Sequence, residues 1–205
     1  GDDGATGHHR RRARALKAWG KPAQRKLFVD KSAKIRASFV RVRPKDIVLT
    51  KRGLRFQGRF YPCSIGRGGI SDRKREGDGA TPSGSHEIVG LLFRPDRLAA
   101  PTDWARPIGP SDLWSDDPTD QDYNMMVQVP YSGRHERLMR ADPLYDLIIL
   151  TNWNWPYAVK GRGSAIFLHQ WRRPHYPTEG CIGVSRTDLR RIAKGLRFGT
   201  KLVIA

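Results

Sequence analysis

The sequence predicts a mainly β protein with one or a few short helices. Two observations predict this class. Short apolar runs rich in β-branched and aromatic residues recur along the chain, separated by turn residues. The composition, with 21 Gly and 14 Pro among 205 residues, is also typical of a globular protein rich in turns. A chain of this length has room for one ordinary domain and a tail.

Residues 1–34 are expected to form a basic flexible tail, and residues 35–205 a single folded domain. Residues 1–45 hold 14 Lys and Arg against 3 acidic residues, whereas residues 46–205 hold 24 against 17. The tail has few apolar positions, so it cannot bury enough surface to offset the entropy of ordering. Most of the formal net charge of +18 therefore lies in residues 1–45.

The expected strands follow one another through the domain. A hairpin is predicted where LTKRGLRF turns at KRG, between residues 49 and 56. The expected strands are IRASFVRV (35–42), DIVLT (46–50), LRFQG (54–58), RFYPCSIG (59–66), HEIVGLLF (86–93), NMMVQVP (124–130), LYDLIIL (144–150), SAIFLH (164–169) and KLVIA (201–205). Two long stretches, 66–84 and 94–124, are interpreted as loops because Gly, Pro and Asp dominate them.

One segment, SRTDLRRIAKGLRFG (185–199), predicts a helix. Ser185 is the expected N-cap, and Asp188 follows it at the position of a capping box. Gly199 is expected to end the helix. The apolar residues recur at helical spacing and form one stripe: Leu189, Ile192, Ala193 and Leu196.

The stretch TEGCIGVS (178–185) carries most of the functional content. A cysteine nucleophile needs a base, donors for the developing oxyanion, and backbone room for a substrate carbonyl. His169, at the end of a strand-like run and 12 positions before Cys181, is a candidate base. The amides around Gly180 and Cys181 are candidate oxyanion donors. A lone Cys and His are more often core residues than a catalytic pair, so the surrounding motif has to decide.

The motif FLH followed by TEGC resembles the signature of the YkuD-type L,D-transpeptidases, in which a His and a loop precede Ser/Thr-x-Gly-Cys. The upstream stretch GDGATPSGSHEI (77–88) is similar to the family's Gly-x-x-Thr-Pro-x-Gly pattern, with Gly79, Thr81, Pro82 and Gly84 at its fixed positions. The resemblance covers about residues 40–205. It implies a β-sandwich-like catalytic domain.

The resemblance also implies an activity. Cys181 would be the nucleophile and His169 the base, and the thiolate would attack the carbonyl at the L-centre of a diaminopimelate residue in a peptidoglycan stem peptide. The acyl group would then pass to an amine of a neighbouring stem. Carbapenems would acylate the same thiol. The resemblance implies no metal and no other cofactor, and it implies a place in the periplasm or cell envelope.

Six further residues are expected to bind substrate. Glu179 and Gly183 flank the nucleophile where many family members have His or Lys and Arg or Asn, so specificity is expected there. A carboxylate at 179 should disfavour a nearby thiolate unless it pairs with Arg172 or Arg173. The other four candidates, each with a structural role as the alternative, are Arg67 in the glycine-rich loop, His86 after the TPSG turn, and Tyr145 and Trp153 beside the run DLIILTN.

Alternative functions remain open at this point. An L,D-carboxypeptidase or amidase would use the same acyl-enzyme, because water and an amine compete for one thioester. A basic module that binds nucleic acid or another anionic polymer is favoured only by the net charge, and most of that charge lies in residues 1–45. For a wall enzyme the tail would instead contact an anionic wall polymer or membrane surface. The protein is expected to be a monomer.

Overall fold

The structure is a computed structural model, and it describes residues 42–205. The expected basic tail, residues 1–34, lies outside the described residues. The expected strand at 35–42 does too, except for Val42, which belongs to no strand. Within the described range the protein is mainly β, as predicted, with one α-helix and one short 3-10 helix.

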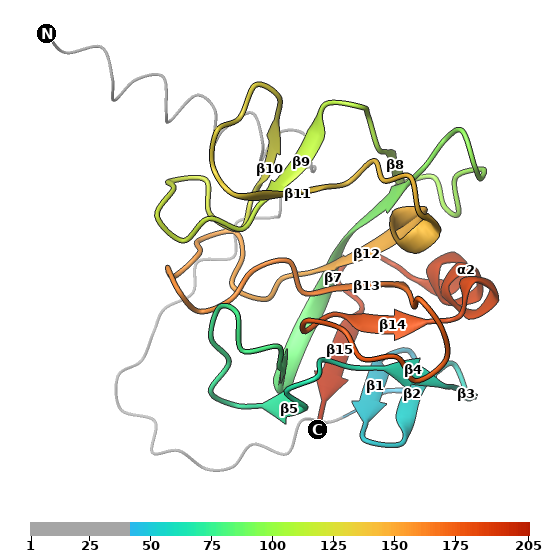
Figure 1. The fold of residues 1–205 in the computed structure, drawn as a ribbon. Helices are drawn as coiled ribbons and strands as arrows, with labels where there is room; N and C mark the ends of the chain where they lie inside the picture. Colours follow the sequence, from blue (N-terminus) through green and yellow to red (C-terminus); the bar gives the residue numbers. More distant parts are fainter. Residues whose placement is uncertain (1–41) are drawn as a thin grey trace, which may run out of the picture. The chain divides into compact units, whose positions relative to one another are not determined.

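A ten-stranded sheet forms the framework of the domain (Figure 1). Nine of its strands follow the order β3-β2-β1-β15-β7-β12-β13-β14-β4, and β8 pairs with β7. The strands are β1 (Ile47–Thr50), β2 (Gly53–Phe56), β3 (Arg59–Tyr61), β4 (Cys63–Ser64), β7 (Gly84–Phe93), β8 (Arg106–Pro107), β12 (Leu147–Thr151), β13 (Phe167–Gln170), β14 (Ile182–Val184) and β15 (Lys201–Ile204). The predicted hairpin is confirmed as β1 and β2, where Leu49 pairs with Leu54.

The sheet nearly closes on itself. β3 and β4 lie at opposite ends of the strand order, yet only Pro62 separates them in the sequence. The curved sheet encloses a core of fully buried side chains, since alternate residues of each strand point to the same face. This core includes Ile47, Leu49, Leu54, Ile88, Leu91, Ile149, Leu168, Ile182 and Leu202.

A second, smaller sheet covers the opposite face of β12 and β13. It has the order β10-β9-β11 and contains β10 (Met126–Gln128), β9 (Asp112–Ser115) and β11 (His135–Arg137). Trp114 of β9 packs edge-on against Phe167 of β13, with ring centroids 4.9 Å apart. The prediction of a loop throughout 94–124 is therefore wrong, because β8 and β9 fall within it. The loop prediction for 66–84 is likewise interrupted by β5 (Ile70–Ser71) and β6 (Thr81–Pro82).

The helix α2 (Arg186–Gly195) begins as predicted and ends earlier than predicted. The Ser185 hydroxyl oxygen accepts a hydrogen bond from the Asp188 amide at 3.1 Å, which caps the helix. The helix ends at Gly195 and not near Gly199, because Leu196 is already extended and turns its buried side chain into the core. Within residues 42–205 no helix is long and apolar enough to cross a membrane.

Candidate active site

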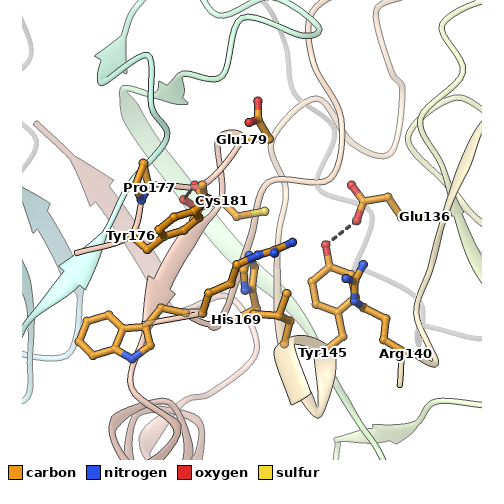
Figure 2. Close-up of a pocket in the computed structure, with 12 residues that line it drawn as sticks. Glu136, Arg140, Tyr145, His169, Tyr176, Pro177, Glu179 and Cys181 are labelled. Carbon is orange, nitrogen blue, oxygen red and sulfur yellow. Dashed lines mark hydrogen bonds between the residues drawn. The ribbon is translucent and has the colours of Figure 1, made fainter. Parts of the chain in front are cut away.

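A pocket of about 370 Å³ opens beside Cys181 and His169 (Figure 2). Cys181 precedes β14 and His169 belongs to the parallel neighbour β13, so the pairing of these two strands brings both residues to one pocket. Four of the predicted site residues line this pocket: Cys181, His169, Glu179 and Tyr145. Its other walls come from residues that were not predicted as site residues: Glu136, Arg140, Leu144, Trp171, Arg172, Tyr176, Pro177 and Thr178.

The Cys181 side chain is held by the strand beside it. Its Sγ donates a hydrogen bond to the Ala165 carbonyl oxygen at 3.0 Å and accepts one from the Phe167 amide at 3.4 Å. Burial raises the pKa of the thiol to about 12, and the nearby Glu136 carboxylate acts in the same direction. At pH 7 the side chain is therefore a neutral thiol.

The His169 ring has a defined tautomer. Its Nδ1 lies 2.7 Å from the Gln170 carbonyl oxygen, which can only accept, so Nδ1 carries the proton and Nε2 is left as an acceptor. Burial lowers the pKa of His169 to about 4. The resting pair at pH 7 is thus a thiol and a neutral imidazole, and not a thiolate–imidazolium ion pair.

Thr81 of the upstream motif holds the segment before the nucleophile. Its hydroxyl donates to the Gly180 carbonyl oxygen at 2.9 Å and accepts from the Gly66 amide at 2.9 Å. Gly180 has a φ of 137°, and a Cβ built there would lie 2.8 Å from the Ala80 carbonyl oxygen. A Cβ on Gly66 would lie 2.9 Å from the Gly180 Cα. Glycine is required at both positions because the two backbones touch.

Thr178 closes the turn that carries Cys181. Its hydroxyl donates to the Cys181 carbonyl oxygen at 2.5 Å and accepts from the Gly180 amide at 3.2 Å. One of the two amides predicted as oxyanion donors is thus already bonded within the turn. A substrate oxyanion would have to compete with Thr178 for the Gly180 amide.

Glu179 pairs with Arg67, and not with Arg172 or Arg173 as its position suggested. Arg67 Nε donates to both carboxylate oxygens, at 3.0 and 2.9 Å. Arg67 itself does not line the pocket beside Cys181, whereas Arg172 does. Arg173 lies over the Tyr176 ring at 4.9 Å from its centroid. The pairing follows from the fold, because the Arg67 amide donates to the Thr178 carbonyl oxygen at 2.8 Å.

Gly183 contacts a wall residue of the pocket without lining the pocket itself. It pairs with His169 in the β13–β14 register. A Cβ at this position would lie 3.1 Å from the Trp171 Cβ, which is closer than ordinary van der Waals contact. The absence of a side chain at 183 therefore lets Trp171 pack directly over β14.

A tyrosine and a carboxylate extend the site behind His169. The Tyr145 hydroxyl donates a short hydrogen bond to Glu136, and the Tyr145 ring packs edge-on against His169 with centroids 5.3 Å apart (Figure 2). Burial raises the pKa of the Glu136 carboxyl. The Arg140 guanidinium lies over the Tyr145 ring at 5.2 Å from its centroid. Two of its nitrogens donate hydrogen bonds to the Asp142 carboxylate.

Two of the predicted substrate-binding residues lie elsewhere. His86 and Trp153 line a separate pocket of about 500 Å³ that shares no lining residue with the first. The reason is their place in the sheet, because His86 is the third residue of β7, opposite Leu202, and Trp153 follows β12. Lys74, in the glycine-rich stretch 66–84, is not available to substrate, because it is buried and its Nζ lies 2.6 Å from an Asp78 carboxylate oxygen.

A known family model matches most of the chain. Residues 26–204 match YkuD, the L,D-transpeptidase catalytic domain. A search of curated proteins found no match. The family match covers all the strands of the described domain and includes both motifs. The chain therefore belongs to the YkuD family of L,D-transpeptidase catalytic domains.

Proposed function

We propose that the protein is a peptidoglycan L,D-transpeptidase that forms an acyl-enzyme on Cys181. The observation that carries this proposal is the shared pocket, in which a buried thiol and an imidazole with an unprotonated Nε2 come from adjacent parallel strands. No metal or other cofactor is needed for this reaction, because the thiol supplies the nucleophile and the imidazole moves the proton.

The reaction begins when a stem peptide binds and the Cys181 S–H turns from the Ala165 carbonyl oxygen toward His169 Nε2. His169 Nε2 takes this proton as Sγ attacks the carbonyl carbon at the L-centre of diaminopimelate. The tetrahedral intermediate then collapses, the carbon–nitrogen bond breaks, and the imidazolium returns its proton to the departing amine of the terminal D-residue. A thioester remains on Cys181. The amine of a second stem attacks this thioester, passes a proton to His169, and restores the thiol.

Because the Cys181 thiol and the His169 imidazole are both uncharged at rest, the proton is transferred during attack on the carbonyl and not before it. A pKa near 12 for Cys181 and near 4 for His169 disfavours an ion pair before substrate arrives. Transfer of the proton therefore accompanies attack, when the carbonyl oxygen takes up the negative charge. The Cys181 amide, together with the Gly180 amide if it leaves Thr178, would donate to that oxygen.

The charges around the pocket suit a zwitterionic peptide. Arg140 and Arg172 can bind stem carboxylates, while Glu136 and Glu179 can bind ammonium groups. Glu179 is already paired with Arg67, so the pair presents little net charge at the rim. The pocket can thus bind both the carboxylates and the ammonium groups of the donor and acceptor stems.

Hydrolysis through the same thioester is the second candidate, because the pocket is open to solvent and water competes with the amine. A binding module for anionic polymers would not need the buried thiol and oriented imidazole. We place the enzyme in the periplasm or cell envelope, where its substrate lies, as a monomer. Its basic tail would contact an anionic wall polymer or membrane surface.

Incubation with purified disaccharide-tetrapeptide muropeptides, followed by mass spectrometry, tests the proposal. Wild type should give cross-linked dimers and release the terminal D-residue, and a carbapenem should add its mass to Cys181. Cys181→Ala should abolish all three results. Cys63→Ala is the matched control, since it removes the other cysteine on neighbouring β4 and should leave turnover intact. Monomeric hydrolysis products alone would favour the carboxypeptidase, and no Cys181-dependent product would refute both enzymes.

A further inference from the structure

The second pocket, of about 500 Å³, lies between the start of β7 and the loop that joins β12 to β13. Its distinctive lining residues are Ser83, Ser85, His86, Trp153, Tyr157 and Arg162. The proposed reaction uses none of them. We propose that this pocket, named here the aromatic pocket, binds a saccharide of the glycan strand that carries the stem peptide.

Exposed aromatic rings are the first feature that points to a saccharide. Trp153, Trp155 and Tyr157 all line the aromatic pocket, and Tyr157 leaves 78% of its surface exposed. A ring this exposed contributes little to the core of the domain. Aromatic rings offer a flat apolar face with a polar edge, and the C–H face of a pyranose ring matches such a surface.

A ring nitrogen without a partner is the second feature. Within residues 42–205, His86 Nε2 is buried and has no hydrogen-bond partner, and a Cβ on the pocket residue Gly84 would lie 4.0 Å from it. The His86 side chain is itself 93% buried and packs edge-on against Trp153, with centroids 5.5 Å apart. Buried polar atoms are nearly always satisfied, so unpaired ones at a pocket wall indicate a missing ligand group.

The remaining polar groups favour hydroxyls over peptide groups. The Asn152 side-chain oxygen accepts from the Glu87 amide of β7, and the Asn154 side chain donates to the Val159 and Gly163 carbonyl oxygens of the loop. The hydroxyl groups of Ser83 and Ser85 remain at the mouth. Sugar hydroxyls both donate and accept, and can therefore pair with a serine and with a neutral imidazole.

The charge of the aromatic pocket is positive. Arg162 lies over the Trp153 ring at 4.9 Å from its centroid, and no acidic residue lines the pocket. Burial lowers the pKa of His86, and the Arg162 charge acts in the same direction. The imidazole is thus neutral at pH 7. The pocket accepts a neutral or acidic sugar and disfavours a cationic one.

The loop of the aromatic pocket leads directly to the nucleophile. Residues 152–165 form this loop, and the Ala165 carbonyl at its end accepts the Cys181 hydrogen bond. The loop is also tied to the glycine-rich segment, because the Glu76 amide donates to the Gly161 carbonyl oxygen at 2.9 Å. In Figure 1 the orange loop after β12 lies at the same end of the sheet as the teal loop before β7. One polymer can therefore occupy both pockets.

A titration with chitotetraose, a peptide-free oligomer of N-acetylglucosamine, tests the saccharide site. Isotope-labelled protein should show shifts confined to residues 83–86 and 152–162. Tyr157→Ala should raise the Kd about 5-fold through loss of stacking. His86→Phe keeps a ring and removes the unpaired nitrogen, and it should also weaken binding. Phe198→Ala removes an exposed ring from outside this pocket and should leave the Kd unchanged.

The identity of the polymer rests on the proposed function, whereas saccharide binding is measured without catalysis. Cys181→Ala should bind chitotetraose as wild type does while forming no muropeptide dimers. Failure of the proposed function would therefore leave binding intact. Absence of saccharide binding by wild type would overturn the site, and so would a Kd equal to that of wild type in both Tyr157→Ala and His86→Phe. So would shifts in this loop with a free stem tripeptide alone, because they would assign the pocket to peptide.

Discussion

The reactivity of Cys181 toward an alkylating agent should be unusually low at neutral pH. Burial raises the pKa of its thiol from 9.0 to about 12, so the thiolate fraction at pH 7 falls about 1,000-fold relative to an ordinary thiol. A more basic thiolate is also more nucleophilic, and a Brønsted slope of about 0.4–0.5 returns roughly 15- to 30-fold of that loss. The net expectation is alkylation about 30- to 60-fold slower than that of free cysteine.

The assay is iodoacetamide labelling between pH 6 and pH 10, with peptide mass spectrometry to separate the two cysteines. Cys63→Ala gives a chain with a single thiol, and N-acetylcysteine is the reference. The logarithm of the Cys181 rate should rise with pH across the whole range, without a plateau. His169→Gln should leave this profile unchanged, because the pKa of His169, about 4, already makes the ring neutral.

An ion pair would behave differently. A plateau of reactivity with an apparent pKa below about 7, lost in His169→Gln, is the signature of a thiolate held by an imidazolium. That outcome would refute the neutral resting pair and the coupling of proton transfer to attack. It would leave Cys181 as the nucleophile and change only the order of events.

Three further predictions concern residues around the site. Thr81→Val removes the hydroxyl that bonds to Gly180 and should lower the free energy of unfolding by about 1–3 kcal/mol, measured by urea titration. Thr81→Ser keeps a hydroxyl and should lower it less. Equal losses in the two variants would contradict the hydrogen-bond argument. Gly183→Ala places a Cβ 3.1 Å from the Trp171 Cβ and should raise KM for muropeptide while changing Tm only slightly. An unchanged KM would show that this contact does not affect substrate binding. Ser185→Ala should cost about 1 kcal/mol of stability through loss of the helix cap, measured by thermal unfolding, with kcat unchanged; a Tm equal to wild type would show that the cap contributes nothing.

The parts of the fold that local sequence determines were predictable. The hairpin of β1 and β2 has both strands and its turn within residues 47–56, and the cap of α2 lies within four residues. By contrast, the sequence of β9 contains Asp and Trp and shows no regular apolar pattern. Its pairing with β10 and β11 is set by tertiary contacts. The three-residue β14 is too short to show an alternation of apolar and polar residues. Its register is fixed by pairing with the parallel strand β13.

The candidate site also has a part that was predictable from local sequence and a part that was not. Cys181 and His169 were predictable, because residues close together in the motif also lie close together in the structure. The partner of Glu179 could not be read from spacing, because Arg67 comes from a segment 112 positions earlier that returns beside Thr178. Glu136 carried no sequence signal either, since a lone acidic residue in an irregular stretch is ordinarily solvated.

The position of β15 in the sheet has a consequence for biosynthesis. This strand lies between β1 and β7, and it pairs with β1 from the early part of the described chain. Until residues 201–204 leave the ribosome, both neighbouring strands keep an unpaired edge, and such edges recruit other chains. Joining them closes a loop of about 150 residues, which slows folding. The nascent protein therefore depends on protection from aggregation until β15 arrives.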